Sequence, residues 1–127
     1  MADEVFSIHG VVASLRDDGI FHMIIDTHEM TSSAVIDLGH RSIEYCEKHA
    51  PVRYLVEVVS LNFDDLAARW KMVEIFKEQR PYIFRTAIVG LGVSATLIGR
   101  IGVRAAGRSN VEFFTELAAA EKYLLRG

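Results

Sequence analysis

The chain has 127 residues, of which 50% are apolar and 24% are charged, and its net charge is −3. A sequence of this length and apolar content predicts one domain over residues 1–127 with a buried core, and argues against disorder. The 14 basic residues are fewer than the 17 acidic ones, which argues against general nucleic-acid binding, because that function needs a basic surface. The single cysteine, Cys46, excludes an intramolecular disulfide.

No apolar run reaches the roughly 18 residues of a membrane span. The first ten residues, MADEVFSIHG, are acidic and lack the basic start of a signal peptide. We therefore expect a cytoplasmic protein. No catalytic motif or metal-ligand spacing stands out, so we expect neither an enzyme nor a metal or cofactor.

The first half of the chain predicts a hairpin, a helix and a central strand. Apolar runs at 5–16 and 20–25 are separated by the turn signal Asp-Asp-Gly, which indicates two antiparallel strands. The hydroxyl residues at 31–33 can cap a helix that ends before Pro51. Residues 54–59 are apolar apart from Glu57, which is typical of a strand covered on both faces.

The second half predicts two more strand–helix units and a last short strand and helix. Asp64 or Asp65 can cap a helix in which Trp70 takes an apolar position, so we expect Trp70 in the core. A strand at 82–89 is followed by a helix at 94–106, and a strand at 109–114 is followed by a helix that Thr115 caps. The predicted order is ββαβαβαβα, an α/β fold with about five strands, mostly parallel, and four helices.

Three stretches resemble the STAS domain, and within it the SpoIIAA-like group of anti-sigma-factor antagonists. They are LVEVVSLNFDD at 55–65, the single Trp70, and RTAIVG at 85–90 with the final EKYLLRG. The resemblance implies a βα superhelix and a non-enzymatic regulatory or adaptor role. It also implies an apolar ligand as an alternative, because the fold is related to lipid-carrying domains.

The corner after the central strand is the first candidate site, and it would bind a protein partner. Its candidate residues are Ser60, Asn62, Asp64 and Asp65. Regulatory members of the STAS family carry a phosphorylated serine at this corner. The matching stretch here, DDLA at 64–67, has no hydroxyl, so the resemblance does not extend to that phosphorylation.

The loop at 90–95 is the second candidate site, and it belongs to the alternative function of a small-molecule carrier. Gly90, Gly92 and Ser94 fit the pattern G-x-G-x-x-A, which can bring backbone N–H groups to a phosphate. A tight turn that needs glycine backbone angles is the simpler interpretation. A pocket for an apolar or anionic ligand would lie between this loop, the next helix and the sheet.

The helix at 94–106 combines apolar and basic residues. Leu97 and Ile101 would line the pocket, whereas Arg100 and Arg104 would form a basic stripe with Arg108. Such a helix suits the surface of a membrane or an acidic partner, and the alternative is an ordinary half-buried helix.

Two further expectations concern charge and assembly. Glu57 lies inside an apolar strand and needs a partner, for which Arg53, Arg69 and Arg85 are candidates. The high apolar content also suggests a homo-oligomer.

Overall fold

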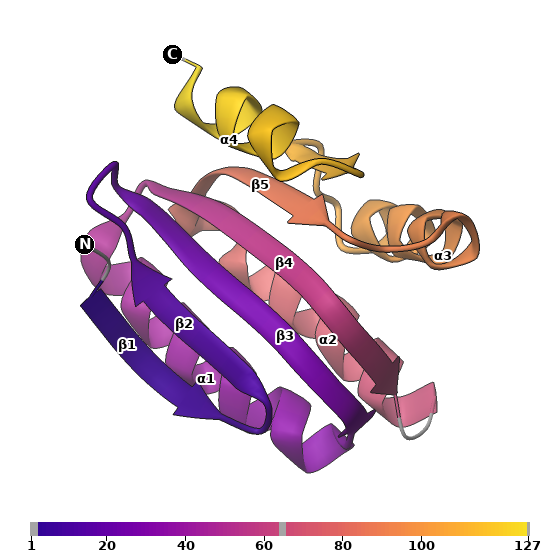
Figure 1. Cartoon of the computed structure of the whole chain (residues 1–127). Coiled ribbons are helices and arrows are strands. Elements are labelled where there is room, and N and C mark those ends of the chain that lie inside the picture. Colours follow the sequence, from indigo (N-terminus) through magenta and orange to yellow (C-terminus); the bar gives the residue numbers. More distant parts are fainter. Residues whose placement is uncertain (1–2, 64–65, 127) are drawn as a thin grey trace.

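The computed structural model describes residues 3–63 and 66–126, and it has an α/β fold (Figure 1). Within these residues a six-stranded sheet carries four α-helices and one short 3-10 turn, Arg80–Tyr82. The elements are β1 (Asp3–Ile8), β2 (Val11–Leu15), β3 (Ile20–Met30), α1 (Ser32–His49), β4 (Val52–Phe63), α2 (Leu66–Gln79), β5 (Ile83–Val89), α3 (Val93–Ala105), β6 (Val111–Phe114) and α4 (Leu117–Leu125).

The strands lie in the sheet in the order in which they occur in the chain. The pairs β1–β2 and β2–β3 are antiparallel, whereas β3 to β6 are parallel and each connection between them contains a helix. The α/β class and the mostly parallel sheet are therefore confirmed. The order differs from the prediction by one strand, since the chain begins with three strands before its first helix.

The additional strand arises at His9 and Gly10, because we expected a single strand over 5–16 although Gly10 interrupts its apolar residues. Both residues have positive φ angles, of 53° and 75°, which turns the chain back between β1 and β2. A Cβ atom at Gly10 would lie 2.5 Å from the carbonyl oxygen of Asp26, so this close approach of β3 also requires glycine. The prediction of about five strands was wrong for this reason.

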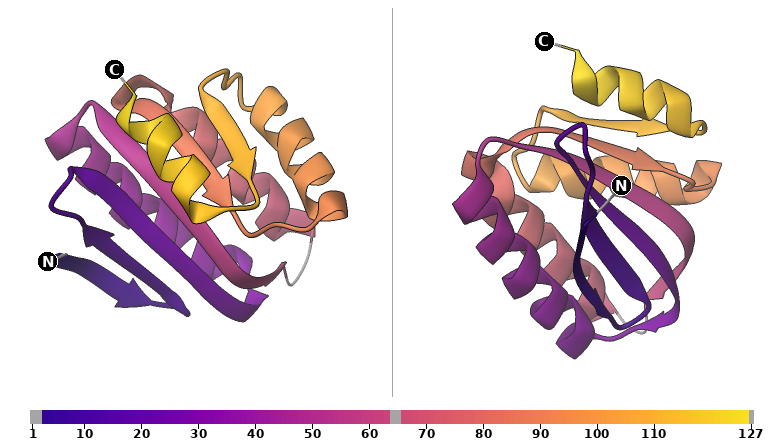
Figure 2. Two further views of the ribbon diagram at one scale, coloured as in Figure 1. Left: turned by 45° about the horizontal axis from the view of Figure 1, so that its top comes forward. Right: turned by 60° about the vertical axis from the view of Figure 1, so that its left-hand side comes forward.

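Helices cover the two faces of the sheet unequally. The helices α1, α2 and α3 lie on one face, and α4 lies on the other, over β4, β5 and β6 (Figure 2). The larger apolar core lies between the sheet and the first group of helices. A smaller core packs α4 against the sheet through Leu55, Ala87, Ala120 and Leu124. We call the first face the α-face.

The strands β3 and β4 are longer than predicted and run together to the corner. We expected the chain to leave the sheet at Asp26, but β3 continues to Met30, where it pairs with Phe63 of β4. The pairing register shifts twice in this extension, and the Ser60 hydroxyl donates a hydrogen bond of 2.6 Å to Asp26 across it. The corner is thus an extension of the central sheet.

The helix boundaries follow local chemistry with one exception. Thr31 caps α1, since its Oγ1 accepts a hydrogen bond from the backbone N–H of Ala34. The prediction that Thr115 caps the last helix was wrong, because α4 begins after Glu116 and that position makes no side-chain cap. Among the described residues, none of the helices is both long enough and apolar enough to cross a membrane.

Candidate functional site

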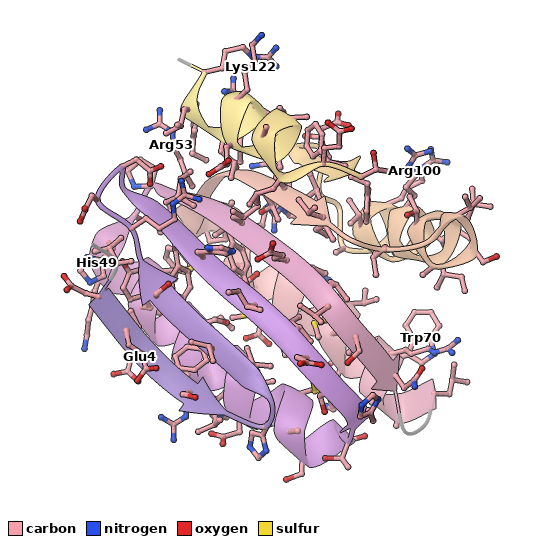
Figure 3. All side chains as sticks on the ribbon, in the orientation of Figure 1. Glu4, His49, Arg53, Trp70, Arg100 and Lys122 are labelled. Atoms are coloured by element: carbon pink, nitrogen blue, oxygen red, sulfur yellow. The ribbon has the colours of Figure 1, made fainter. Side chains whose placement is uncertain are left out.

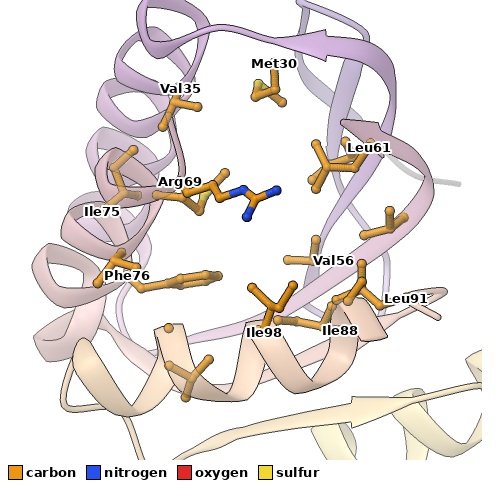
Figure 4. A pocket seen from close by; sticks show the side chains of 18 of the residues that line it. Met30, Val35, Val56, Leu61, Arg69, Ile75, Phe76, Ile88, Leu91 and Ile98 are labelled. Atoms are coloured by element: carbon orange, nitrogen blue, oxygen red, sulfur yellow. The ribbon is translucent and has the colours of Figure 1, made fainter. Parts of the chain in front are cut away.

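A cavity of about 630 Å³ lies between the sheet and the three helices of the α-face (Figure 4). We call it the α-face cavity. Its walls are apolar over most of their surface and come from β3, β4, β5, α1, α2 and α3. Side chains that show its extent in Figure 4 include Met30, Val35, Val56, Leu61, Phe76, Ile88 and Ile98.

The cavity exists because α1 and α2 pack closely, whereas α3 approaches α2 at Gly102, beside Val73, and leaves most of its own surface exposed. Gly39 of α1 lies against Ile75 of α2, where a Cβ atom would come within 2.3 Å of the Ile75 Cδ1. By contrast, α3 buries only Val103 of its 13 residues. An α-helix normally buries a whole apolar stripe, so the apolar face of α3 borders a space that side chains do not fill.

Large apolar side chains surround the opening of the cavity. Leu66 and Trp70 at the start of α2 are 65% and 58% exposed, and Ile101 of α3 is 71% exposed. All three line the cavity. The expectation that Trp70 belongs to the core was wrong, since its exposed side chain projects from the first half of α2 (Figure 3).

The two predicted sites meet at this cavity. Asn62 from the corner lines it, as do Ser94 and Ile101 from the second candidate site. Ser60 is not part of the wall and instead binds Asp26. The other two corner candidates, at 64 and 65, lie outside the described residues.

Other residues of the second site lie elsewhere, since Gly90, Gly92 and Leu97 do not line the cavity. Gly90 has a φ of 99°, and a Cβ atom there would lie 2.2 Å from the carbonyl oxygen of Val58. The turn therefore needs this glycine for its backbone geometry, which accounts for Gly90 without a phosphate.

The basic residues of α3 also face away from the cavity. Arg100 and Arg104 border a smaller hollow of about 240 Å³ together with Glu112, and Figure 3 shows Arg100 on the side of α3 toward α4. Arg108 borders the same hollow, but it follows the end of α3 and is buried, so it adds no exposed basic side chain to the stripe. Its guanidinium donates hydrogen bonds to the Phe76 carbonyl and the Thr86 hydroxyl, so its role is structural.

Few polar groups line the α-face cavity. Tyr54 donates a hydrogen bond of 3.2 Å to the sulfur of Met23, and burial raises the pKa of its hydroxyl. The Gln79 amide donates to the Ser42 hydroxyl at 3.0 Å, while its Oε1 has no partner among the described residues. Arg69 of α2 is the one charged residue among the described residues of the wall.

The opposite face of the sheet carries a histidine–glutamate contact in place of the expected arginine contact. Glu57 lies 3.1 Å from the Nε2 of His22 on the neighbouring strand β3. None of the arginines proposed for Glu57 forms an ion pair with it within the described part of the chain. No cluster of three His, Cys, Asp or Glu side chains suited to a metal occurs among the described residues.

Comparison with known proteins adds no family. Protein-family models, curated proteins and solved structures were each searched, and none matches the chain.

Proposed function

We propose that the protein is a non-enzymatic carrier or sensor of a small, apolar, lipid-like ligand that binds in the α-face cavity. The observation that carries this proposal is the size and lining of the cavity. Its volume of about 630 Å³ lies within the range of about 300–1,000 Å³ that ligand pockets occupy. Domain interiors normally contain few voids larger than a water molecule, and an unfilled apolar void costs stability.

The helix α3 is the part of the wall that would open to admit the ligand. It buries only Val103 and contains Gly99 and Gly102, each of which weakens a helix by about 1 kcal/mol relative to alanine. The exposed apolar side chains on α3 would meet a membrane surface during loading, and Arg100 and Arg104 would favour anionic lipids there. Peripheral contact through residues 94–106 is part of this proposal.

The resemblance to the STAS domain supports the same function. The proposal includes a fold of the SpoIIAA-like type, for which the stretches at 55–65 and 85–90 are the sequence support. That fold is related to lipid-carrying domains, and an apolar ligand is consistent with it.

Uptake of an uncharged, fluorescent naphthylamine probe tests the carrier function. We expect saturable binding of about one probe per chain, with loss of binding in Val56→Phe, because Val56 points into the cavity (Figure 4). A folded Val56→Phe variant that binds the probe as tightly as the unsubstituted protein would exclude the cavity as the site.

A second candidate function is an adaptor that binds a protein partner through the corner at 60–65. Exposed Leu66 and Trp70 directly after the corner favour it, since large apolar side chains at the surface are typical of interfaces. Because Asn62 and Trp70 also line the cavity, such a partner would sense whether the cavity is filled. The partner could be a second copy of the chain.

The adaptor function has its own test. Alanine at Asn62, Asp64 and Asp65 together should abolish capture of the partner and leave the fold intact. Partner binding that survives this triple substitution would place the interface elsewhere. Sedimentation of the unsubstituted chain and the triple variant would show whether the partner is a second copy.

A further inference from the structure

We infer that the ligand of the α-face cavity is an amphiphile whose anionic head group binds the guanidinium of Arg69, while its apolar part fills the cavity. This inference rests on the proposed carrier function and adds the chemical class of the ligand. It depends on the position and surroundings of one side chain.

The position of Arg69 is the first observation. Leu66, Arg69, Trp70 and Val73 all line the cavity, and their spacing of three, four and seven residues places them on one face of α2. Arg69 therefore occupies a place in an apolar stripe. Figure 4 shows its side chain extending from α2 into the space between the helices and the sheet.

The second observation is that Arg69 lacks a counter-ion. It forms no ion pair or hydrogen bond with any residue in the described ranges, 3–63 and 66–126. Two other arginines do have acidic partners, since Arg16 binds both Asp18 and Glu121 and Arg41 binds Asp37. A guanidinium presents five N–H donors in a planar array, and those of Arg69 remain available to a ligand.

The surroundings of Arg69 select an anion. No acidic residue lies in the described part of the cavity wall, so none of the described wall residues would repel a negative head group. Carboxylate and phosphate groups both accept two parallel hydrogen bonds from a guanidinium. Asn62, also in the wall and exposed, adds an amide donor near the corner.

The exposure of Arg69 fixes the direction of the ligand. Arg69 is an exposed residue, as are its neighbours Leu66 and Trp70. Val35 and Met30 lie deeper in the wall and are fully buried. The head group therefore sits at the opening, and the apolar tail extends inward.

Three ligands with the same alkyl chain test the inference: dodecanoate, dodecyl phosphate and 1-dodecanol. Each is used below the concentration at which it aggregates or leaves solution. Binding is followed by the fluorescence of Trp70, the single tryptophan of the chain and a residue of the cavity wall. We expect at least one anionic ligand to bind about tenfold or more tightly than the alcohol. The tighter of the two anions identifies carboxylate or phosphate as the head group.

Variants assign this preference to Arg69. In Arg69→Gln the anions should bind no more tightly than the alcohol, whose own affinity should not change, and Arg69→Lys should retain part of the preference. Arg41→Gln is the matched control, because it removes an exposed arginine of α1 that does not line the α-face cavity.

The outcomes separate this inference from the carrier function. Equal binding of the alcohol and both anions by the unsubstituted protein would overturn the anionic head group and leave the carrier function standing. The same holds if Arg69→Gln keeps the full preference for anions. Failure of all three ligands and of the naphthylamine probe to bind would overturn both proposals.

Discussion

Filling the α-face cavity by Val56→Phe should stabilise the ligand-free protein, whereas the same change in a filled core destabilises it. Val56 is 6% exposed, lies on the central strand β4 and lines the cavity. The substitution is preferable to one at Gly99, where a Cβ atom would come within 2.9 Å of Phe113. The sign of the stability change thus shows whether the α-face cavity is unfilled in the ligand-free protein.

The size of the effect follows from the added apolar volume. A phenyl ring adds about four carbon atoms to the valine side chain, and each buried carbon contributes ~0.8 kcal/mol, so the upper limit is about 3 kcal/mol. Ordering the larger side chain costs about 1 kcal/mol. We expect a net gain of about 1–2 kcal/mol in the free energy of unfolding, or roughly 4–8 °C in Tm for a domain of this size.

Urea unfolding of delipidated protein measures this change, with Val89→Phe as the matched control. Val89 is 5% exposed on β5, packs in the smaller core under α4 and does not line the α-face cavity. Overpacking there should cost about 1–3 kcal/mol. A loss of stability at Val56 as large as that at Val89 would refute the reasoning, because it would mean that the cavity is filled.

Three other experiments test separate parts of the structure. Trp70→Ala should cost less than about 2 kcal/mol in urea unfolding, since the side chain is 58% exposed; a loss of 3–5 kcal/mol would return it to the core. Gly90→Ala should cost more than about 2 kcal/mol because of its φ of 99° and the Val58 oxygen, whereas Gly92→Ala, with no atom within 4 Å, should change stability by less than about 1 kcal/mol; equal effects would contradict this. Burial raises the pKa of the Cys46 thiol to about 12, so the folded protein should resist a thiol reagent at pH 8 until urea unfolds it, and fast labelling of the folded chain would disagree.

The helical pattern of α2 was predicted correctly, but its meaning was not. Leu66, Trp70 and Val73 recur at helical spacing, and such a stripe normally faces a filled core. In the structure the stripe lines a cavity, because α3 meets α2 beside Val73 and does not cover Leu66 and Trp70, which stay exposed. Spacing along one helix reports which residues share a face, and it contains no information on the distance to the next helix.

Arg69 was noticed in the sequence only as a partner for Glu57. One local signal could have found its place in the site, namely a basic residue three positions after Leu66, on the same face of the helix as the apolar stripe. Glu57 itself contacts His22 on the neighbouring strand. The two residues are 35 positions apart in the sequence, so the contact depends on the register between β3 and β4.

The ends of the long strands were also beyond prediction from local pattern. Asp26, Ser60 and Asn62 are polar and resemble loop residues, yet all three belong to strands. Their strand conformation depends on pairing between β3 and β4 along their whole length. Such long-range pairing is a tertiary effect that overrides local propensity.

Native mass spectrometry of the gently purified protein tests the central claim, that the α-face cavity holds a ligand, most directly. We expect a non-covalent adduct, or one-to-one uptake of added dodecanoate, that disappears on denaturation and is absent from Val56→Phe. An unliganded mass under all these conditions, or an adduct that persists in the folded Val56→Phe protein, would contradict the account.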